Sequence, residues 1–244
     1  MLNDIATVMW KEIKELPYLR GGFRGGKFGM LIFVFVFGVY MPLQTGREWV
    51  TSPLVLAYWA WVPFLLVSSV IADSFAGERE RHTLETLLAS RLSDRAILFG
   101  KIAAGIAYGW GLTMGCILIG LIAVNIVHGK GELLLFPANI GLGVLSLTFL
   151  IAMLASGLGV LISLRSATVR QAQQTFSIAF FLLFIPVFAL PMLPPEWQAR
   201  LVSGLMQADV NTILLGAVGL LLLLNAALVL AALKRFQRAK LILD

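Results

Sequence analysis

Long apolar stretches alternate with short polar segments along this chain of 244 residues. A helix needs about 20 apolar residues to cross a bilayer, because each residue adds about 1.5 Å. Between their end residues these stretches contain no Asp, Glu, Lys or Arg except Lys101. The pattern predicts six transmembrane helices, over residues 28–45, 50–72, 98–127, 136–164, 172–193 and 210–233.

Composition supports the same conclusion. Apolar residues make up 59% of the chain and charged residues 13%, so lipid must solvate much of it. We expect an all-α, polytopic membrane protein with a single domain. Its expected parts are a cytoplasmic interfacial helix and hinge (1–27), a six-span bundle (28–233) and a cytoplasmic tail (234–244). The single cysteine, Cys116, and the separated His82 and His128 predict neither a disulfide nor a metal site.

The basic residues are distributed unevenly between the two predicted sides of the membrane. If the N-terminus is cytoplasmic, sixteen of the 19 Lys and Arg residues fall in inside segments. Only Arg47, Lys130 and Arg200 then lie outside, and such an excess marks the cytoplasmic side. We therefore expect both termini in the cytoplasm. The net charge of +6 then reports membrane topology rather than nucleic-acid binding.

The first polar segment has an amphipathic helical pattern. Its apolar positions recur at helical spacing opposite the polar ones. The apolar row is Ile5, Val8, Met9, Ile13 and Leu16, and the polar row is Asp4, Lys11, Glu12 and Glu15. This pattern predicts an interfacial helix along the inner membrane surface, with Trp10 as an anchor. A soluble helix packed on a partner is the alternative.

The segment GGFRGGK at residues 21–27 contains most of a phosphate-binding loop, G-x-x-x-x-G-K-[ST]. However, the residue after Lys27 is Phe28, which has no hydroxyl to hold magnesium, and no strand precedes the loop. We therefore interpret the four glycines as a hinge between the surface helix and the first span. Arg24 and Lys27 are expected to lie at lipid phosphates.

A segment rich in proline separates the fifth and sixth predicted spans, PMLPPEWQARLVSGLMQAD at residues 191–209. Its amphipathic part, around Trp197, Leu201, Leu205 and Met206, is too short to cross a bilayer. We expect a re-entrant hairpin at the outer face, where protein must shield irregular backbone.

The highest density of charge lies between the second and third spans, in DSFAGERERHTLETLLASRLSDRAILFGK at residues 73–101. In helical register Leu84, Leu87 and Leu88 share one side. Glu78, His82 and Glu85 share another, and Arg81 precedes Glu85 by four residues, as in a helical ion pair. These positions predict a short cytoplasmic helix that docks a soluble partner. A solvated loop with surface ion pairs is the alternative.

The same segment resembles the signature of ABC-2 type transporter permeases, the membrane subunits of ATP-driven exporters. That signature has an acidic residue, then E-x-E-x-x-T-L-E-x-L-L, a few small residues and a lysine that opens the next span. The matching residues are Asp73, Glu78, Glu80, Thr83, Leu84, Glu85, Leu87, Leu88, Gly100 and Lys101. The surface helix, the spans, the outer hairpin and the turn SLRSATVRQAQQ at 163–174 extend the resemblance over the whole chain. His82 and Arg91 stand where many relatives have glycine and proline.

This resemblance implies a permease in the plasma membrane of a prokaryote, paired with a second copy or a related permease. A separate ATPase subunit would bind ATP and Mg²⁺, so this chain would carry no cofactor and no catalytic residue. The surface helix at 3–16 and the hairpin at 77–90 would contact that ATPase, with 164–172 nearby. The implied coupling residues are Glu78, Arg79, Glu80, Arg81, Thr83, Leu84, Glu85 and Leu88. Closure of the ATPase would expel substrate outward.

Aromatic and polar side chains within the spans are candidates for a substrate path. They are Tyr58, Trp59, Trp61, Trp110 and Asn225. The aromatic residues would equally suit packing against lipid, and Asn225 is interpreted first as a contact between helices. Small residues in the third span, Gly105, Gly109, Gly111 and Gly115, suit close helix approach within the chain or between subunits.

Two other functional classes remain open, an ATPase-independent channel or secondary transporter and a non-transporting membrane anchor for an ATPase. Ion-coupled carriers need ionisable residues inside the membrane, and we expect none buried in these spans. The apolar lining favours an amphipathic or lipid-linked substrate over a bare ion.

Overall fold

The computed structural model describes residues 1–15, 27–189, 192–207 and 209–236. Within these residues every regular element is a helix. The elements are α1 (Leu2–Glu15), α3 (Phe28–Phe35), the π-helical turn η2 (Val36–Tyr40), α4 (Met41–Thr45), α5 (Glu48–Thr51), α6 (Leu54–Ala60), α7 (Val62–Ile71), α8 (Asp73–Glu80), α9 (Leu84–Ala89), α10 (Asp94–His128), α11 (Ala138–Arg165), α12 (Val169–Ala189), α13 (Pro195–Gln207) and α14 (Val210–Arg235). The prediction of an all-α protein is confirmed for this part of the chain.

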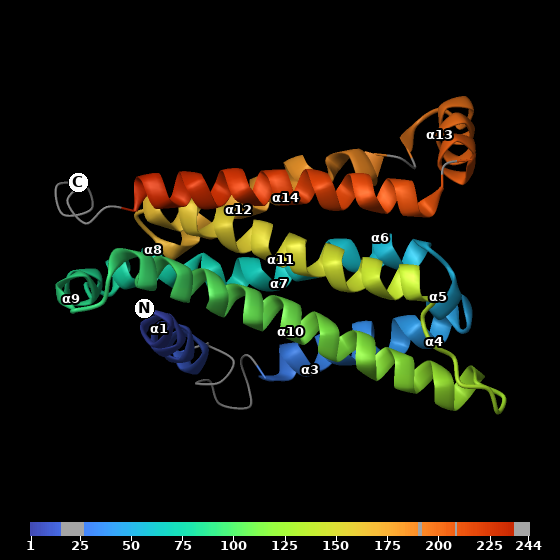
Figure 1. The fold of residues 1–244 in the computed structure, drawn as a ribbon, viewed down its shortest axis with the longest axis horizontal. Helices are drawn as coiled ribbons and strands as arrows, with labels where there is room; N and C mark the ends of the chain where they lie inside the picture. The colour runs from blue at the N-terminus through green and yellow to red at the C-terminus, as the bar shows by residue number, and fades with distance from the viewer. Residues whose placement is uncertain (16–26, 190–191, 208, 237–244) are drawn as a thin grey trace.

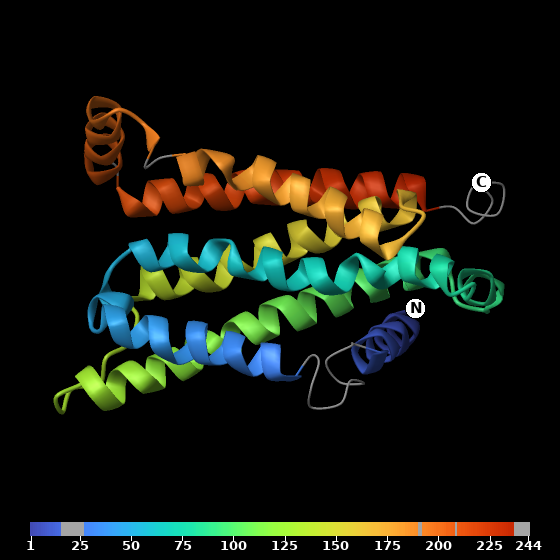
Figure 2. The ribbon, with the colours of Figure 1, turned by 180° about the vertical axis from the view of Figure 1, so that it is seen from behind.

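The long helices run side by side along one axis (Figure 1). α11 lies between α10 and α14, and α1 lies against α10. α1, α9 and the C-terminal end of α14 are at one end of the bundle, which we call the hairpin end (Figures 1 and 2). α5 and α13 are at the opposite end, where α13 stands across the bundle axis. The hairpin end therefore gathers the elements that the charge pattern assigns to the cytoplasm, and the orientation itself stays a prediction.

Five of the helical segments are long and apolar enough to cross a membrane, counted over the described residues. They are Phe28–Thr45, Val55–Glu80, Asp94–His128, Ala138–Arg165 and Val210–Arg235. The first segment has the predicted bounds. α12 covers most of the predicted fifth span but is not among the five, so the count of six stays a prediction.

The second span differs from the prediction at both ends. It was expected at residues 50–72, but it runs from Val55 to Glu80. Ser52 has an extended backbone because the residue before a proline avoids the helical conformation, and this separates α5 from α6. At its other end the helix continues through Asp73–Glu80. The charged segment therefore begins as a direct extension of the span.

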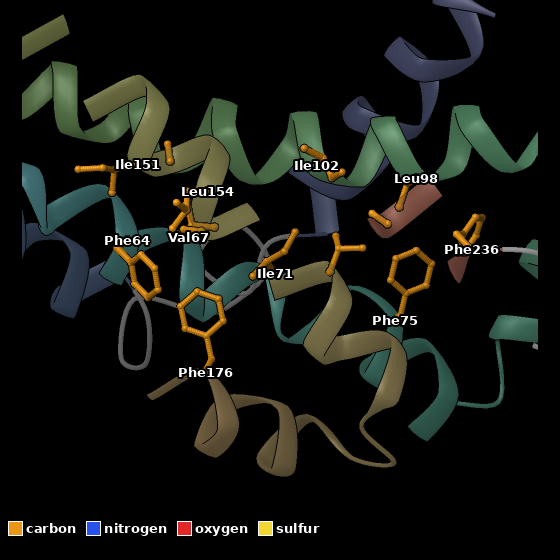
Figure 3. Packing of buried hydrophobic residues seen from close by; sticks show 14 of the residues in the cluster. Phe64, Val67, Ile71, Phe75, Leu98, Ile102, Ile151, Leu154, Phe176 and Phe236 are labelled. Carbon is orange, nitrogen blue, oxygen red and sulfur yellow. The ribbon is translucent and has the colours of Figure 1, made fainter. Parts of the chain in front are cut away.

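Two large groups of buried apolar side chains stabilise the bundle, beside a small one of Ala72, Ala76 and Ala172. The larger group joins α7, α8, α10, α11 and α12, and Figure 3 shows its packing. Phe64 contacts Phe176 with ring centroids 4.8 Å apart, and Phe75 contacts Phe236 at 5.3 Å. The second group surrounds Trp49 and Trp59. Leu84 of α9 belongs to the larger group, so the charged hairpin is packed onto the bundle.

Two sequence expectations concern segments that the structure covers in part or not at all. The proposed glycine hinge, Gly21, Gly22, Gly25 and Gly26, lies outside the described residues and stays a prediction. The amphipathic outer segment forms α13, with Trp197 largely exposed. Its re-entry into the membrane stays a prediction.

Candidate functional site

The charged hairpin consists of two helices rather than one. α8 ends at Glu80, and α9 begins at Leu84. Between them His82 has a left-handed backbone, with φ of 55°. The predicted common face of Glu78, His82 and Glu85 is therefore wrong, because a left-handed residue ends the helical register. Glycine adopts this conformation most easily, and histidine tolerates it better than most other residues.

Arg81 pairs with Asp73 and not, as predicted, with Glu85. The Arg81 Nη2 atom lies 3.1 Å from Asp73 Oδ2. The turn after Glu80 takes α9 away from the axis of α8, so the expected spacing of four residues along one helix does not exist. The hydrogen bond to Asp73 raises the pKa of Arg81 above its ordinary value.

Arg79 binds the C-terminal end of α11. Its Nη1 atom donates to the carbonyl oxygen of Ser166 at 2.6 Å, and its Nη2 atom donates to that of Leu164 at 3.1 Å. The last carbonyl groups of a helix have no partner within the helix and carry partial negative charge. The guanidinium group therefore caps α11 and joins it to α8.

Glu80 binds the start of α12. Its Oε2 atom accepts a hydrogen bond from the backbone N–H of Val169 at 3.2 Å. The first N–H groups of a helix are unpaired and carry partial positive charge, so a carboxylate is favourable there. Glu80 thus joins α8 to the helix that follows α11.

Ser163 explains the break between α7 and α8. Its buried hydroxyl accepts hydrogen bonds from the N–H groups of Phe75 and Ala76, at 3.0 and 2.9 Å, and donates to the carbonyl of Ala72 at 3.0 Å. The hydroxyl group is inserted between Ala72 and Ala76 and takes the place of the normal helical hydrogen bond between them. Ser163 therefore joins α11 to the point where α7 ends and α8 begins.

Glu78, the first residue of the E-x-E pair, belongs to a buried charge cluster, which we define as Lys11, Glu12, Glu78 and Lys101. Lys101 Nζ lies 2.8 Å from Glu12 Oε1 and 3.1 Å from Glu78 Oε1, and it donates to the carbonyl of Ser74 at 2.7 Å. Lys11 Nζ lies 2.9 Å from Glu78 Oε1. Lys101 is 1% exposed and Glu78 is 4% exposed. The cluster joins α1, α8 and α10.

This charge cluster corrects two expectations. The spans were expected to bury no acid or base, but Lys101 and Glu78 are both buried. The polar row of the N-terminal helix was expected to face away from the apolar contacts, but Lys11 and Glu12 bind the bundle. Opposite charges at hydrogen-bonding distance offset the loss of water, which is what makes such burial tolerable. Burial opposes the charge of Lys11, but its hydrogen bond to Glu78 and the nearby carboxylates outweigh this effect, so the pKa of Lys11 is raised.

The implied coupling residues separate into buried and exposed groups. Glu78 and Leu84 are buried, and Arg79 is half-buried. The exposed residues are Glu80, Arg81, Thr83 and Glu85, while the side chain of Leu88 is outside the described part of the chain. A cavity of about 500 Å³ lies between α1, α8 and α9, with Lys11, Glu78 and Arg81 in its lining. The accessible face of the hairpin is therefore its turn and the start of α9.

The apolar face of α1 packs on α10. Val8 is buried and packs closely on Gly100. If Gly100 had a Cβ atom, that atom would lie only 2.5 Å from the Cβ atom of Val8. Ile5, Met9 and Ile13 are half-buried, and Trp10 is exposed. The helix is therefore partly covered by its own chain, and its contact with lipid stays a prediction.

Three of the candidate path residues meet in one cavity. Tyr58, Trp59 and Trp61 line a space of about 240 Å³ at the end of the bundle opposite the hairpin. The other residues of this lining are Phe37, Met41, Gln44, Thr45 and Trp49. No charged side chain is in the lining, so the cavity suits an apolar or amphipathic molecule.

The other two candidate residues make contacts between helices. Trp110 Nε1 donates to Thr148 Oγ1 at 3.2 Å, which joins α10 to α11. Asn225 Nδ2 donates to the carbonyl of Leu150 at 3.0 Å, which joins α14 to α11. The interpretation of Asn225 as a helix contact is confirmed, and neither residue is in the lining of the aromatic cavity.

Comparison with known proteins identifies the class. A family model described as ABC-2 family transporter protein matches residues 40–206, more than half of the chain. The chain therefore belongs to the ABC-2 transporter family. It is similar to the ABC transporter permease protein NatB of Bacillus subtilis (strain 168), with 29% identity over 159 residues. That match covers 59% of this chain and 40% of the relative, so the chain spans less than half of the relative's length.

Sequence reasoning missed the residues that hold the hairpin in place. Glu12 and Lys101 are 89 positions apart, and Ser163 is 87 positions from Ala76. One signal was present, because Lys101 is the lone charge within a predicted apolar span. A lone lysine in such a span requires a carboxylate partner, and helical register alone does not identify which one.

Proposed function

We propose that this chain is the membrane permease subunit of an ABC exporter and that a separate ATPase subunit docks at the hairpin end. The observation that carries the proposal is the exposed hairpin turn, at the same end as α1, within a family of transporter permeases. The first helix of the hairpin, α8, is joined to α11 by Arg79 and to α12 by Glu80. A force applied at the turn would therefore reach several spans.

In this proposal the exposed residues Arg81, Thr83 and Glu85 contact the ATPase. Three further residues would hold the hairpin in place without touching the ATPase, because their side chains are buried or half-buried in the bundle. They are Glu78, Arg79 and Leu84. ATP and Mg²⁺ would be bound by the ATPase subunit and not by this chain. The substrate would be amphipathic or lipid-linked, and Tyr58, Trp59 and Trp61 would line part of its path.

The proposal also includes a membrane arrangement. The whole of residues 1–244 would form one transmembrane domain with six spans, α12 being the fifth. α1 would lie at the inner surface of the cell membrane, both termini would be cytoplasmic, and α13 would form a re-entrant hairpin outside. Two permeases, identical or related, would pair around the path. The excess of basic residues at the hairpin end supports this orientation.

The test is recovery of the ATPase with the tagged chain from its native membrane in mild detergent. Glu85→Ala and Arg81→Ala should reduce recovery, and Glu132→Ala is the matched control, because Glu132 is exposed near the start of the loop after α10. Equal recovery with all three variants would remove the hairpin from the docking role. Failure of the wild-type chain to recover any ATPase would favour a channel or secondary transporter instead. Hydrolysis of ATP by the isolated chain would contradict a non-catalytic role.

A further inference from the structure

The charge cluster joins α1 to the bundle. In the chain α1 comes before α3, and a segment outside the described residues lies between them. The contacts of α1 with the bundle include the packing of Val8 on Gly100 and the ion pairs of Lys11 and Glu12. The ion pairs are the polar, directional part of this contact, and they belong to the charge cluster.

Lys101 is the central member of that cluster. Its ammonium group has three N–H donors and three acceptors within 3.1 Å, on Glu12, Glu78 and Ser74. Glu12 comes from α1, and Glu78 and Ser74 come from α8. The side chain of Lys101 has no exposed surface, whereas that of Lys11 is 41% exposed. Without Lys101, two carboxylates from different helices would face each other beside a single, partly solvated cation.

We infer that Lys101 is a positioning residue that holds α1, the hairpin and the start of α10 together as one unit during transport. The inference rests on the proposed function, because α1 and the hairpin are the two elements proposed to contact the ATPase. Lys101 would keep them in a fixed position relative to each other. A movement imposed on either element is then transmitted directly to α10, the long helix that contains Lys101.

The distance between α1 and α9 tests this inference. Spin labels at Thr7→Cys and Ala89→Cys would sit on exposed positions of the two helices, in a Cys116→Ala background. The distance would be measured by pulsed electron paramagnetic resonance on folded, detergent-solubilised chain. It would then be measured on the complex with the ATPase, without nucleotide and with vanadate-trapped nucleotide. The expected result for the unmodified cluster is one narrow distance in every state.

Lys101→Met should lose this single distance and give a broad distribution. Glu12→Ala provides a second variant that leaves the pair between Lys101 and Glu78 intact, and it should have the same effect. Lys14→Met is the matched control, because Lys14 is an exposed residue of α1 that contacts Trp10 and lies outside the cluster. It should keep the narrow distance.

A role limited to stability would lower the melting temperature but leave the distance within the folded fraction unchanged. Narrow distributions in both Lys101→Met and Glu12→Ala would therefore overturn the inference. The measurement on the chain alone does not need the ATPase, so it decides the role of Lys101 even if no ATPase is recovered. Failure to recover an ATPase would count against the proposed function and not against the positioning role of Lys101.

Discussion

The glycines of α10 allow a direct test of the helix packing. A Cβ atom at Gly109 would lie 2.4 Å from Val67 Cγ2 and 3.3 Å from the carbonyl oxygen of Pro63, whereas a Cβ atom at Gly111 would meet no atom within 4 Å. Gly109→Ala and Gly111→Ala are therefore the same chemical change, two residues apart on one helix. Only the first change should force α7 and α10 apart.

The magnitude follows from separating two effects. Replacing glycine with alanine within a helix favours folding by about 1 kcal/mol, and this gain is common to both variants. Overpacking at a close contact costs about 1–3 kcal/mol, and it applies to Gly109→Ala alone. The free energies of unfolding should therefore differ by about 1–3 kcal/mol. For a chain of this size the melting temperature of Gly109→Ala should be about 2–12 °C below that of Gly111→Ala.

The assay uses the single cysteine of the chain. Cys116 is fully buried, so a thiol-reactive dye should become fluorescent only as the protein unfolds. Thermal unfolding of both variants in the same detergent would give the two midpoints. Equal midpoints, or a higher midpoint for Gly109→Ala, would refute the close contact between α7 and α10.

Three further predictions use the same thermal assay. Arg79→Ala should lower the free energy of unfolding by about 1.5–3 kcal/mol, because it removes a charged cap from α11, and an unchanged midpoint would contradict that cap. His82→Val should destabilise the chain by about 1–2 kcal/mol, because a branched side chain opposes a positive φ, whereas His82→Gly should not. Lys11 should stabilise the folded chain by a constant amount from about pH 7 to 9. In this range Lys11 is charged in both the unfolded and the folded chain, because its pKa is about 10.5 when unfolded and is raised on folding. The difference between wild type and Lys11→Met should shrink only at higher pH, and a decline below pH 9 would refute this.

The membrane helices were predictable because their signal is local. An uninterrupted apolar run specifies a span whatever its neighbours are, and the segment Phe28–Thr45 matched its prediction at both ends. The amphipathic pattern likewise predicted a helix close to the observed α1. The preference of Asn225 for a neighbouring helix followed from the high free energy of an unpaired amide in lipid.

The geometry of the hairpin was not predictable in this way. Helical register assumed that residues 77–90 form one helix, and a single left-handed residue, His82, invalidated every face derived from it. The partners of Glu78, Arg79 and Glu80 come from segments remote in sequence. Their local pattern shows that they are charged, but the packing of α1, α10, α11 and α12 determines which group each one binds.

The attachment of α14 to α11 has a consequence for biosynthesis. Only 6% of the residues in the most apolar stretch of α14 are buried. However, Asn225, near the middle of this helix, is 2% exposed and donates a hydrogen bond to α11. α14 leaves the ribosome after α11, so it meets a partner helix that is already made. The hydrogen bond of Asn225 adds a directional contact to the apolar packing of α14 on α11, so it favours one height and one rotation of α14. We therefore expect α14 to find its position late in folding, when this polar residue can select the correct register on α11.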